Sequence, residues 1–201
     1  KRNNESKYKL KEKDLENLKG RITSLWEYLI NRYNINCILF EDIPHQISDW
    51  ILYDIAIRKD GSIWFTDPMY GITFEGFGCE LAEEEQPVRG VYQLKDGVVT
   101  LKTGSVEIPN GIAFSNDEKY LYVANSADGV VYRFEVHGDE LRNKRPWVKI
   151  ESGMRPHPTF GYIADGMQVD KNGNLYVSGG HEGFAIFSPE GKQLENIQPD
   201  A

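Results

Sequence analysis

Hydrophobic and polar positions alternate in a layout that occurs three times along the chain. Each copy opens with a polar pair and a short apolar stretch. It then turns on Asp, Asn, Gly and Lys and enters a stretch of aromatic and β-branched residues. The copies occupy residues 53–67, 110–125 and 165–179. Apolar stretches of this length, separated by turn residues, predict pairs of β-strands.

The polar pairs provide equivalent anchors in the three copies, namely Asp54, Gly111 and Gly166. Measured between these anchors, the copies lie 57 and 55 residues apart. The turn centre follows seven residues after each anchor, at Gly61, Glu118 and Gly173. A repeat of this length made of strands is typical of a propeller blade.

Two further strands are expected in every copy. The third apolar stretch occupies residues 90–94, 130–134 and 183–187. A turn and a weaker fourth strand follow, at residues 98–102, 147–150 and 193–197. Four antiparallel strands per copy predict an all-β fold, a partial β-propeller of about three four-stranded blades, over residues 49–201. The alternative is a β-sandwich with regular turns, which three aligned copies disfavour.

Residues 1–48 have a different character and are predicted to form a separate N-terminal helical or irregular segment. Between residues 8 and 33, apolar side chains recur at steps of three and four, at Leu15, Leu18, Ile22, Leu25 and Leu29. This stripe predicts an amphipathic helix that covers a core or a sheet edge. A coiled-coil partner helix is the alternative, although the pattern is too short to sustain heptads.

The charge of the chain disfavours some classes of partner. The 201 residues have a formal net charge of −8, which disfavours binding to nucleic acid phosphates. The excess negative charge lies entirely in the repeats, where it suits either a cation site or an ordinary solvated surface. No apolar run has the length needed to cross a bilayer, so no membrane partner is expected.

Cysteine usage and the first residues favour a cytoplasmic protein. Cys37 and Cys79 are too far apart in sequence to suggest a disulfide framework or a metal cluster, and two free thiols favour an intracellular setting. The charged N-terminus is not followed by the apolar stretch of a signal peptide.

The anchors also suggest where chemistry takes place. In a propeller the first strand of each blade lines the central channel, so Asp54, Asn110 and Asp165 are predicted to converge at one channel mouth. Carboxylate and amide oxygens are the ligands that Ca²⁺ selects. Gly111 and Gly166 are expected to allow close backbone approach or an unusual dihedral angle. The alternative is that the Asn-Gly and Asp-Gly pairs only form turns.

Four motifs resemble one known family in combination. They are DGSIWFTDPMYG (60–71), RGVYQL (89–94), IPNGIAFSNDEKYLYVANS (108–126) and ADGMQVDKNGNLYVSGG (164–180). They are similar to the gluconolactonase branch of the senescence-marker-protein/regucalcin family. This resemblance implies a six-bladed propeller with one divalent metal in its channel, usually Ca²⁺ and sometimes Zn²⁺. It also implies hydrolysis of a small-molecule sugar lactone.

The resemblance assigns roles to particular residues. It implies metal ligands at Asn110 and Asp165, and it makes Asp165 the leading catalytic base, with activation of water by the metal as the alternative. Asp54, Glu75 and His157 are candidates for substrate binding. Glu75 lies in an acidic stretch that is equally consistent with a solvated face, and a lone His is more often structural than catalytic.

The chain also departs from the family pattern. It lacks the Glu-Gly-Pro motif that carries a further metal ligand, and Tyr53 stands where the family has Asn. About half of the ring is missing, so the chain is expected to be incomplete, with open sheet edges available for self-association. Three hypotheses follow: a metal-dependent lactonase or a segment of one, a non-catalytic propeller remnant or binding module with an impaired metal site, and a repeat scaffold for protein partners.

Overall fold

The structure is a computed structural model that describes residues 54–68, 88–150, 164–179 and 183–197. All of these residues belong to one compact unit, His45–Ala201. The predicted helix over 8–33, both cysteines, Glu75 and His157 lie outside the described residues. Within the described ranges, no helix has the length and apolar character needed to cross a bilayer.

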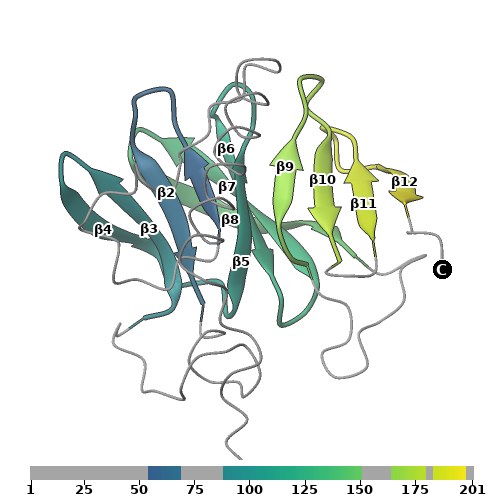
Figure 1. Ribbon diagram of the computed structural model, residues 1–201, viewed down its shortest axis with the longest axis horizontal. Coiled ribbons are helices and arrows are strands. Elements are labelled where there is room, and N and C mark those ends of the chain that lie inside the picture. Colours follow the sequence, from purple (N-terminus) through teal and green to yellow (C-terminus); the bar gives the residue numbers. More distant parts are fainter. Residues whose placement is uncertain (1–53, 69–87, 151–163, 180–182, 198–201) are drawn as a thin grey trace, which may run out of the picture. The chain divides into compact units, whose positions relative to one another are not determined.

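The described residues form three four-stranded antiparallel sheets, each with its strands in chain order (Figure 1). The first sheet contains β1 (Ile55–Ile57), β2 (Ile63–Asp67), β3 (Gly90–Lys95) and β4 (Val98–Thr103). The second contains β5 (Pro109–Phe114), β6 (Tyr120–Asn125), β7 (Val130–His137) and β8 (Glu140–Lys149). The third contains β9 (Met167–Val169), β10 (Leu175–Ser178), β11 (Phe184–Phe187) and β12 (Gln193–Ile197). The prediction of three four-stranded units is therefore confirmed.

The turn between the first two strands has the same geometry in all three sheets. Its central residue has a positive φ in each: 83° at Gly61, 55° at Glu118 and 86° at Gly173. Each central N–H donates to the carbonyl three residues earlier, at distances of 2.9, 2.8 and 3.0 Å respectively. The predicted turn centres are confirmed, including the one where Glu replaces Gly.

The fourth strand of the second sheet is longer than predicted. β8 begins at Glu140 rather than at residue 147, and most of it is exposed. The part that was not predicted, residues 140–146, is mostly exposed and lacks an alternation of apolar and polar residues, so sequence periodicity could not reveal it. Pro146 is tolerated there because an edge strand can lack one N–H donor.

The two inner strands of the second sheet, β5 and β6, are buried on both faces. One apolar cluster joins it to the first sheet and contains Trp64, Val91, Ile112, Leu121 and Phe134. A second cluster joins it to the third sheet and includes Tyr122, Ala124, Met167, Val177 and Phe187. The first strands of the three sheets are neighbours, because β5 packs against both β1 and β9. This arrangement brings the anchors of the repeats together.

Candidate functional site

The anchors meet where β1, β5 and β9 begin. Asp54, just before β1, accepts a hydrogen bond at Oδ2 from the backbone N–H of Ile112 in β5, at 2.9 Å. On the other side of β5, Gly111 lies against the backbone of Asp165 and Met167. The segments that carry Asp54, Asn110 and Asp165 therefore lie next to one another.

Asn110 is almost completely buried, with 1% of its surface exposed. Its side-chain Nδ2 donates to the hydroxyl of Ser126 at 2.9 Å. Its Oδ1 is buried and accepts no hydrogen bond from the residues that the structure describes. An unpaired buried amide oxygen costs about 1–3 kcal/mol, so such an atom in a folded protein calls for an explanation.

The backbone at Asn110 is irregular. The register of β5 against β6 shifts between Pro109 and Ile112, as in a β-bulge. A bulge leaves backbone groups without partners in the ladder and redirects the side chain. The carbonyl of Asn110 accepts instead from the buried hydroxyl of Thr66, at 2.6 Å, so a side chain of the first sheet supports the bulge of the second.

Asp165 is held by its backbone. It lies just before β9, and its N–H donates to the carbonyl of Ser178 at 2.9 Å. Burial is the main cause of the raised pKa of Asp54, and the negative charge of Asp165 adds to it. Two carboxyl groups and one unpaired amide oxygen therefore occupy the same region.

Asp54 joins the first two sheets. Its Oδ1 accepts from the N–H of Ile55 at 2.9 Å, while its Oδ2 accepts from Ile112. Burial raises the pKa of Asp54, the hydrogen bonds from Ile112 and Ile55 act in the opposite direction, and the negative charge of Asp165 adds to the increase. Since both oxygens have backbone partners, the observed role of Asp54 is structural, and substrate binding by this residue stays a prediction.

The two glycines of the anchors differ. A Cβ atom on Gly111 would lie 2.3 Å from the carbonyl oxygen of Asp165, so only glycine allows β5 and β9 to approach this closely. A Cβ on Gly166 would meet nothing within 4 Å, and Gly166 has no positive φ. The expectation that glycine is needed for steric reasons is thus confirmed at Gly111 and wrong at Gly166.

Sequence reasoning missed two supporting residues, Thr66 and Ser126. Both contact Asn110, and both follow an apolar stretch near the end of the second strand of their sheet. A small polar residue in that position of the repeat was the available signal. Ser126 also donates to the carbonyl of Ala164 at 2.8 Å, next to Asp165.

The donor set is suited to a hard divalent cation. Within the described ranges nothing donates to the Oδ1 of Asn110, and amide and carboxylate oxygens are preferred ligands of Ca²⁺. In the part of the chain that the structure describes, no three His, Cys, Asp or Glu residues form a group that could hold a metal ion. A cation bound by Asn110 and Asp165 would need further oxygen ligands to complete its shell.

Comparison with known proteins identifies the family. Residues 32–200 match the family described as "SMP-30/Gluconolactonase/LRE-like region". The chain belongs to this family. The resemblance seen in the motifs is thereby confirmed, and the match begins upstream of the boundary predicted at residue 49.

Related sequences in this family include named lactonases. The chain is 33% identical over 144 residues to a gluconolactonase from Zymomonas mobilis, a match covering 70% of this chain and 39% of the relative. It is 27% identical to Lactonase drp35 from Staphylococcus epidermidis, covering 78% of this chain and 46% of the relative.

Solved structures of the family share the fold. A gluconolactonase from Xanthomonas campestris superposes with a TM-score of 0.63 at 30% identity, covering 75% of this chain and 49% of that one. A calcium-binding regucalcin from Agrobacterium tumefaciens superposes with a TM-score of 0.55 at 16% identity, covering 72% of this chain and 44% of that one. The chain spans less than half the length of each of these relatives.

Proposed function

We propose that this chain is a metal-dependent hydrolase that opens a sugar lactone, or a segment of such an enzyme. Asn110 and Asp165 are the proposed cation ligands. The observation that carries the proposal is the buried Oδ1 of Asn110, which has no hydrogen-bond partner. A cation would satisfy this oxygen. The lactonases and gluconolactonases among its relatives support the choice of substrate class.

Lactone hydrolysis adds water to the ring carbonyl and breaks the bond between the carbonyl carbon and the ring oxygen. A bound divalent cation, Ca²⁺ in the first instance and Zn²⁺ as the alternative, would polarise the carbonyl and stabilise the developing negative charge. Asp165 would orient the attacking water and accept its proton, which then passes to the departing ring oxygen.

Substrate contacts are proposed from three positions. Asp54 lies beside the proposed ligands, and its raised pKa shows that its surroundings disfavour negative charge there. Glu75 and His157 lie outside the described residues and enter the proposal from the sequence alone. Sugar hydroxyl groups are the partners expected for all three side chains.

The test is hydrolysis of gluconolactone by the purified chain. The rate is measured from the protons released while the pH is held constant. Activity is expected with Ca²⁺ and is expected to disappear when a chelator removes the metal. Asp165→Asn and Asn110→Ala are each expected to abolish turnover. Asp117→Asn, which removes an exposed carboxylate from a turn, is the matched control and is expected to leave turnover unchanged.

Thermal unfolding distinguishes this proposal from a non-catalytic binding module. A cation that binds only the folded protein raises the melting temperature with its concentration. We expect millimolar Ca²⁺ to raise it in the parent chain and not in Asn110→Ala. Unchanged turnover in Asp165→Asn or in Asn110→Ala would overturn the metal-dependent mechanism. A melting temperature that changes with neither Ca²⁺ nor Zn²⁺ would do the same.

A further inference from the structure

Ser126 occupies the middle of a buried hydrogen-bond chain that links the two proposed ligand segments. The amide Nδ2 of Asn110 donates to its hydroxyl oxygen at 2.9 Å. That hydroxyl donates in turn to the carbonyl of Ala164 at 2.8 Å. The exposed fraction of the residue surface is 1% for Asn110, 5% for Ser126 and 0% for Ala164. Water therefore does not compete with these bonds.

The chemistry of the Ser126 hydroxyl determines which group donates and which accepts in each of these two hydrogen bonds. A backbone carbonyl can only accept, so the single hydroxyl proton of Ser126 must point to Ala164. Ser126 can then offer Asn110 only a lone pair. The amide of Asn110 must consequently turn its NH₂ group toward Ser126, and its Oδ1 must point the other way.

We propose that Ser126 is a positioning residue that sets the orientation of the Asn110 amide for cation binding. The inference rests on the proposed metal site and goes beyond it, because it explains why Oδ1 rather than Nδ2 is the unpaired atom. Rotation of the amide by half a turn would present N–H groups to the cation and place two lone-pair acceptors against each other at Ser126. The terminal torsion of Asn is soft, so packing or a hydrogen bond must select one orientation.

Ser126 also couples the two ligands to each other. Its acceptor at Ala164 directly precedes Asp165, while Asn110 belongs to the neighbouring sheet. A shift of one segment would stretch a buried hydrogen bond to the other. Outer partners of this kind hold metal ligands in place before the metal arrives, and removing them typically weakens metal binding by about 10- to 100-fold.

The central experiment compares Ser126→Ala with Ser126→Thr by two measurements. The first is NMR of the Asn110 side-chain NH₂ in metal-free protein, where we expect slow hydrogen exchange in the parent and fast exchange in Ser126→Ala. The second is calorimetric titration with Ca²⁺, where we expect Ser126→Ala to lose about 10- to 100-fold in affinity. Ser126→Thr keeps the hydroxyl and is expected to restore both properties.

Thr66→Val is the matched control for a purely structural effect. It removes a buried hydroxyl that also bonds to Asn110, but at the backbone carbonyl rather than at the amide. We expect it to lower stability while the Asn110 NH₂ stays protected and the Ca²⁺ affinity stays near the parent value. Equal losses of affinity in Thr66→Val and Ser126→Ala would overturn the positioning role.

Failure of the inference is distinguishable from failure of the proposed function. If the parent binds Ca²⁺ and Ser126→Ala binds it equally well, the positioning role is wrong and the metal site stands. If the parent binds neither Ca²⁺ nor Zn²⁺, the proposed metal site is wrong, and the proposed role of Ser126 is wrong as well.

Discussion

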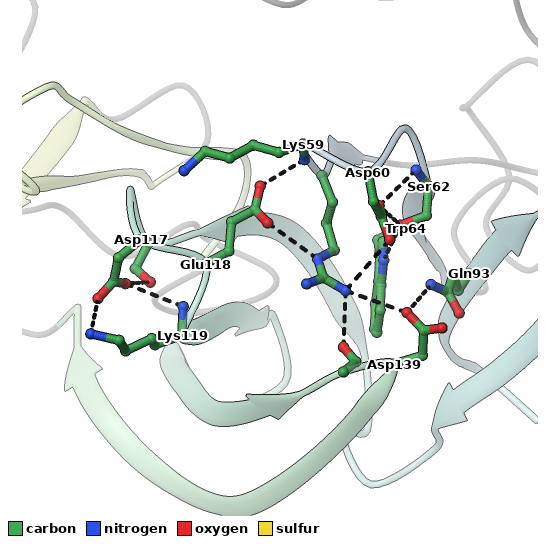
Figure 2. Close-up of polar contacts among 12 residues, drawn as sticks. Lys59, Asp60, Ser62, Trp64, Gln93, Asp117, Glu118, Lys119 and Asp139 are labelled. Atoms are coloured by element: carbon green, nitrogen blue, oxygen red, sulfur yellow. Dashed lines mark hydrogen bonds and ion pairs between the residues drawn. The ribbon is translucent and has the colours of Figure 1, made fainter.

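The two ends of the inner strands differ in the charges that they bring together. At the end with the turns, ion pairs connect Arg58, Asp60, Lys95, Glu118 and Asp139. Figure 2 shows the carboxylates of Asp60, Glu118 and Asp139 in this network. At the opposite end, where the strands begin, Asn110 keeps an unpaired buried oxygen and two carboxyl groups repel each other. The turn end pairs opposite charges, although the buried Nε of Arg58 lies 3.5 Å from Glu118 without a hydrogen bond, whereas the strand-start end brings like charges together.

The network at the turn end joins successive sheets. The side chain of Arg58 is 14% exposed. Its Nε lies 3.5 Å from Oε2 of Glu118, and its Nη1 lies 3.4 Å from Oδ1 of Asp139, both in the second sheet. The ammonium group of Lys59 donates to the carbonyl of Asn116, and the Asn116 amide donates to the carbonyl of Asp170 in the third sheet. The three equivalent turns are therefore connected one after another.

This difference indicates a division of roles within each blade. Unpaired polar atoms and clustered carboxyl groups are unfavourable and persist only where the surrounding structure fixes them. Here the apolar clusters and the linked turns provide that constraint. Local rules of folding are usually broken at functional sites, and the like charges beside a buried amide oxygen agree with a cation site at the strand-start end.

The largest effect is expected from Gly111→Ala at the strand-start end. The new Cβ would lie 2.3 Å from the Asp165 carbonyl oxygen, so β5 and β9 must separate. We expect a loss of about 3 kcal/mol in unfolding free energy, measured by urea denaturation, together with loss of Ca²⁺ binding. Gly166→Ala is the matched control, because its Cβ meets nothing within 4 Å, and it is expected to change stability by no more than about 0.5 kcal/mol. Similar losses in both variants would refute the close-approach argument.

A smaller loss is expected from Arg58→Ala at the turn end. The substitution removes the hydrogen bond to the Gly138 carbonyl, the ion pairs with three carboxylates and the packing against Phe114. We expect a loss of about 1–2 kcal/mol in unfolding free energy with Ca²⁺ affinity retained. Arg142→Ala breaks an exposed pair with Glu140 and is expected to cost less than about 1 kcal/mol. If Arg58→Ala abolished cation binding, the separation of the two ends would be wrong.

Gly61→Ala tests the shared turn geometry. Gly61 has a φ of 83°, and a Cβ there would meet no neighbouring atom, so only backbone strain is introduced. The expected cost is about 1 kcal/mol in unfolding free energy. Gly61→Asn should cost less, since Asn tolerates the left-handed region. Equal stability of the Ala variant and the parent would contradict the required positive φ.

The smallest effect concerns acid stability of the metal-free protein. Hydrogen bonds from Ser115 and then Lys119 lower the pKa of Asp117 to about 2. The stability that this carboxylate provides is complete above its unfolded value of 3.8 and is lost as the pH falls through about 2. Asp117→Asn should therefore flatten the dependence of unfolding free energy on pH in this window. A parallel curve for parent and variant would show that Asp117 makes no such contribution.

Asp54 should respond to acid in the opposite direction. Burial raises its pKa, so the folded protein binds a proton there more readily than the unfolded chain does. Its contribution to stability therefore increases as the pH falls through its folded pKa. Carbon-detected NMR titration of the metal-free chain should show Asp54 titrating at higher pH than Asp117, and the reverse order would contradict the contrast between the two ends.

Local patterning was sufficient to predict most of the fold. Strand pairs, their turns and the three-unit repeat follow from alternation and from turn residues, because neighbours in a hairpin are neighbours in sequence. Even Glu118 was placed at a turn centre by its position in the repeat, and its φ of 55° agrees. The length of β8 was not predicted, because an exposed outer strand leaves no apolar signature.

The sequence by itself determined the family, the blades and the residues that open each inner strand. Only the tertiary structure decided how those residues are supported. Thr66 contacts Asn110 across 44 positions of sequence, and Ser126 contacts Ala164 across 38. Such contacts depend on how one sheet packs against the next, and hydrogen bonds between sheets leave no periodic trace in the chain. The unpaired oxygen of Asn110 is likewise visible only once the donors of the described residues have been placed around it.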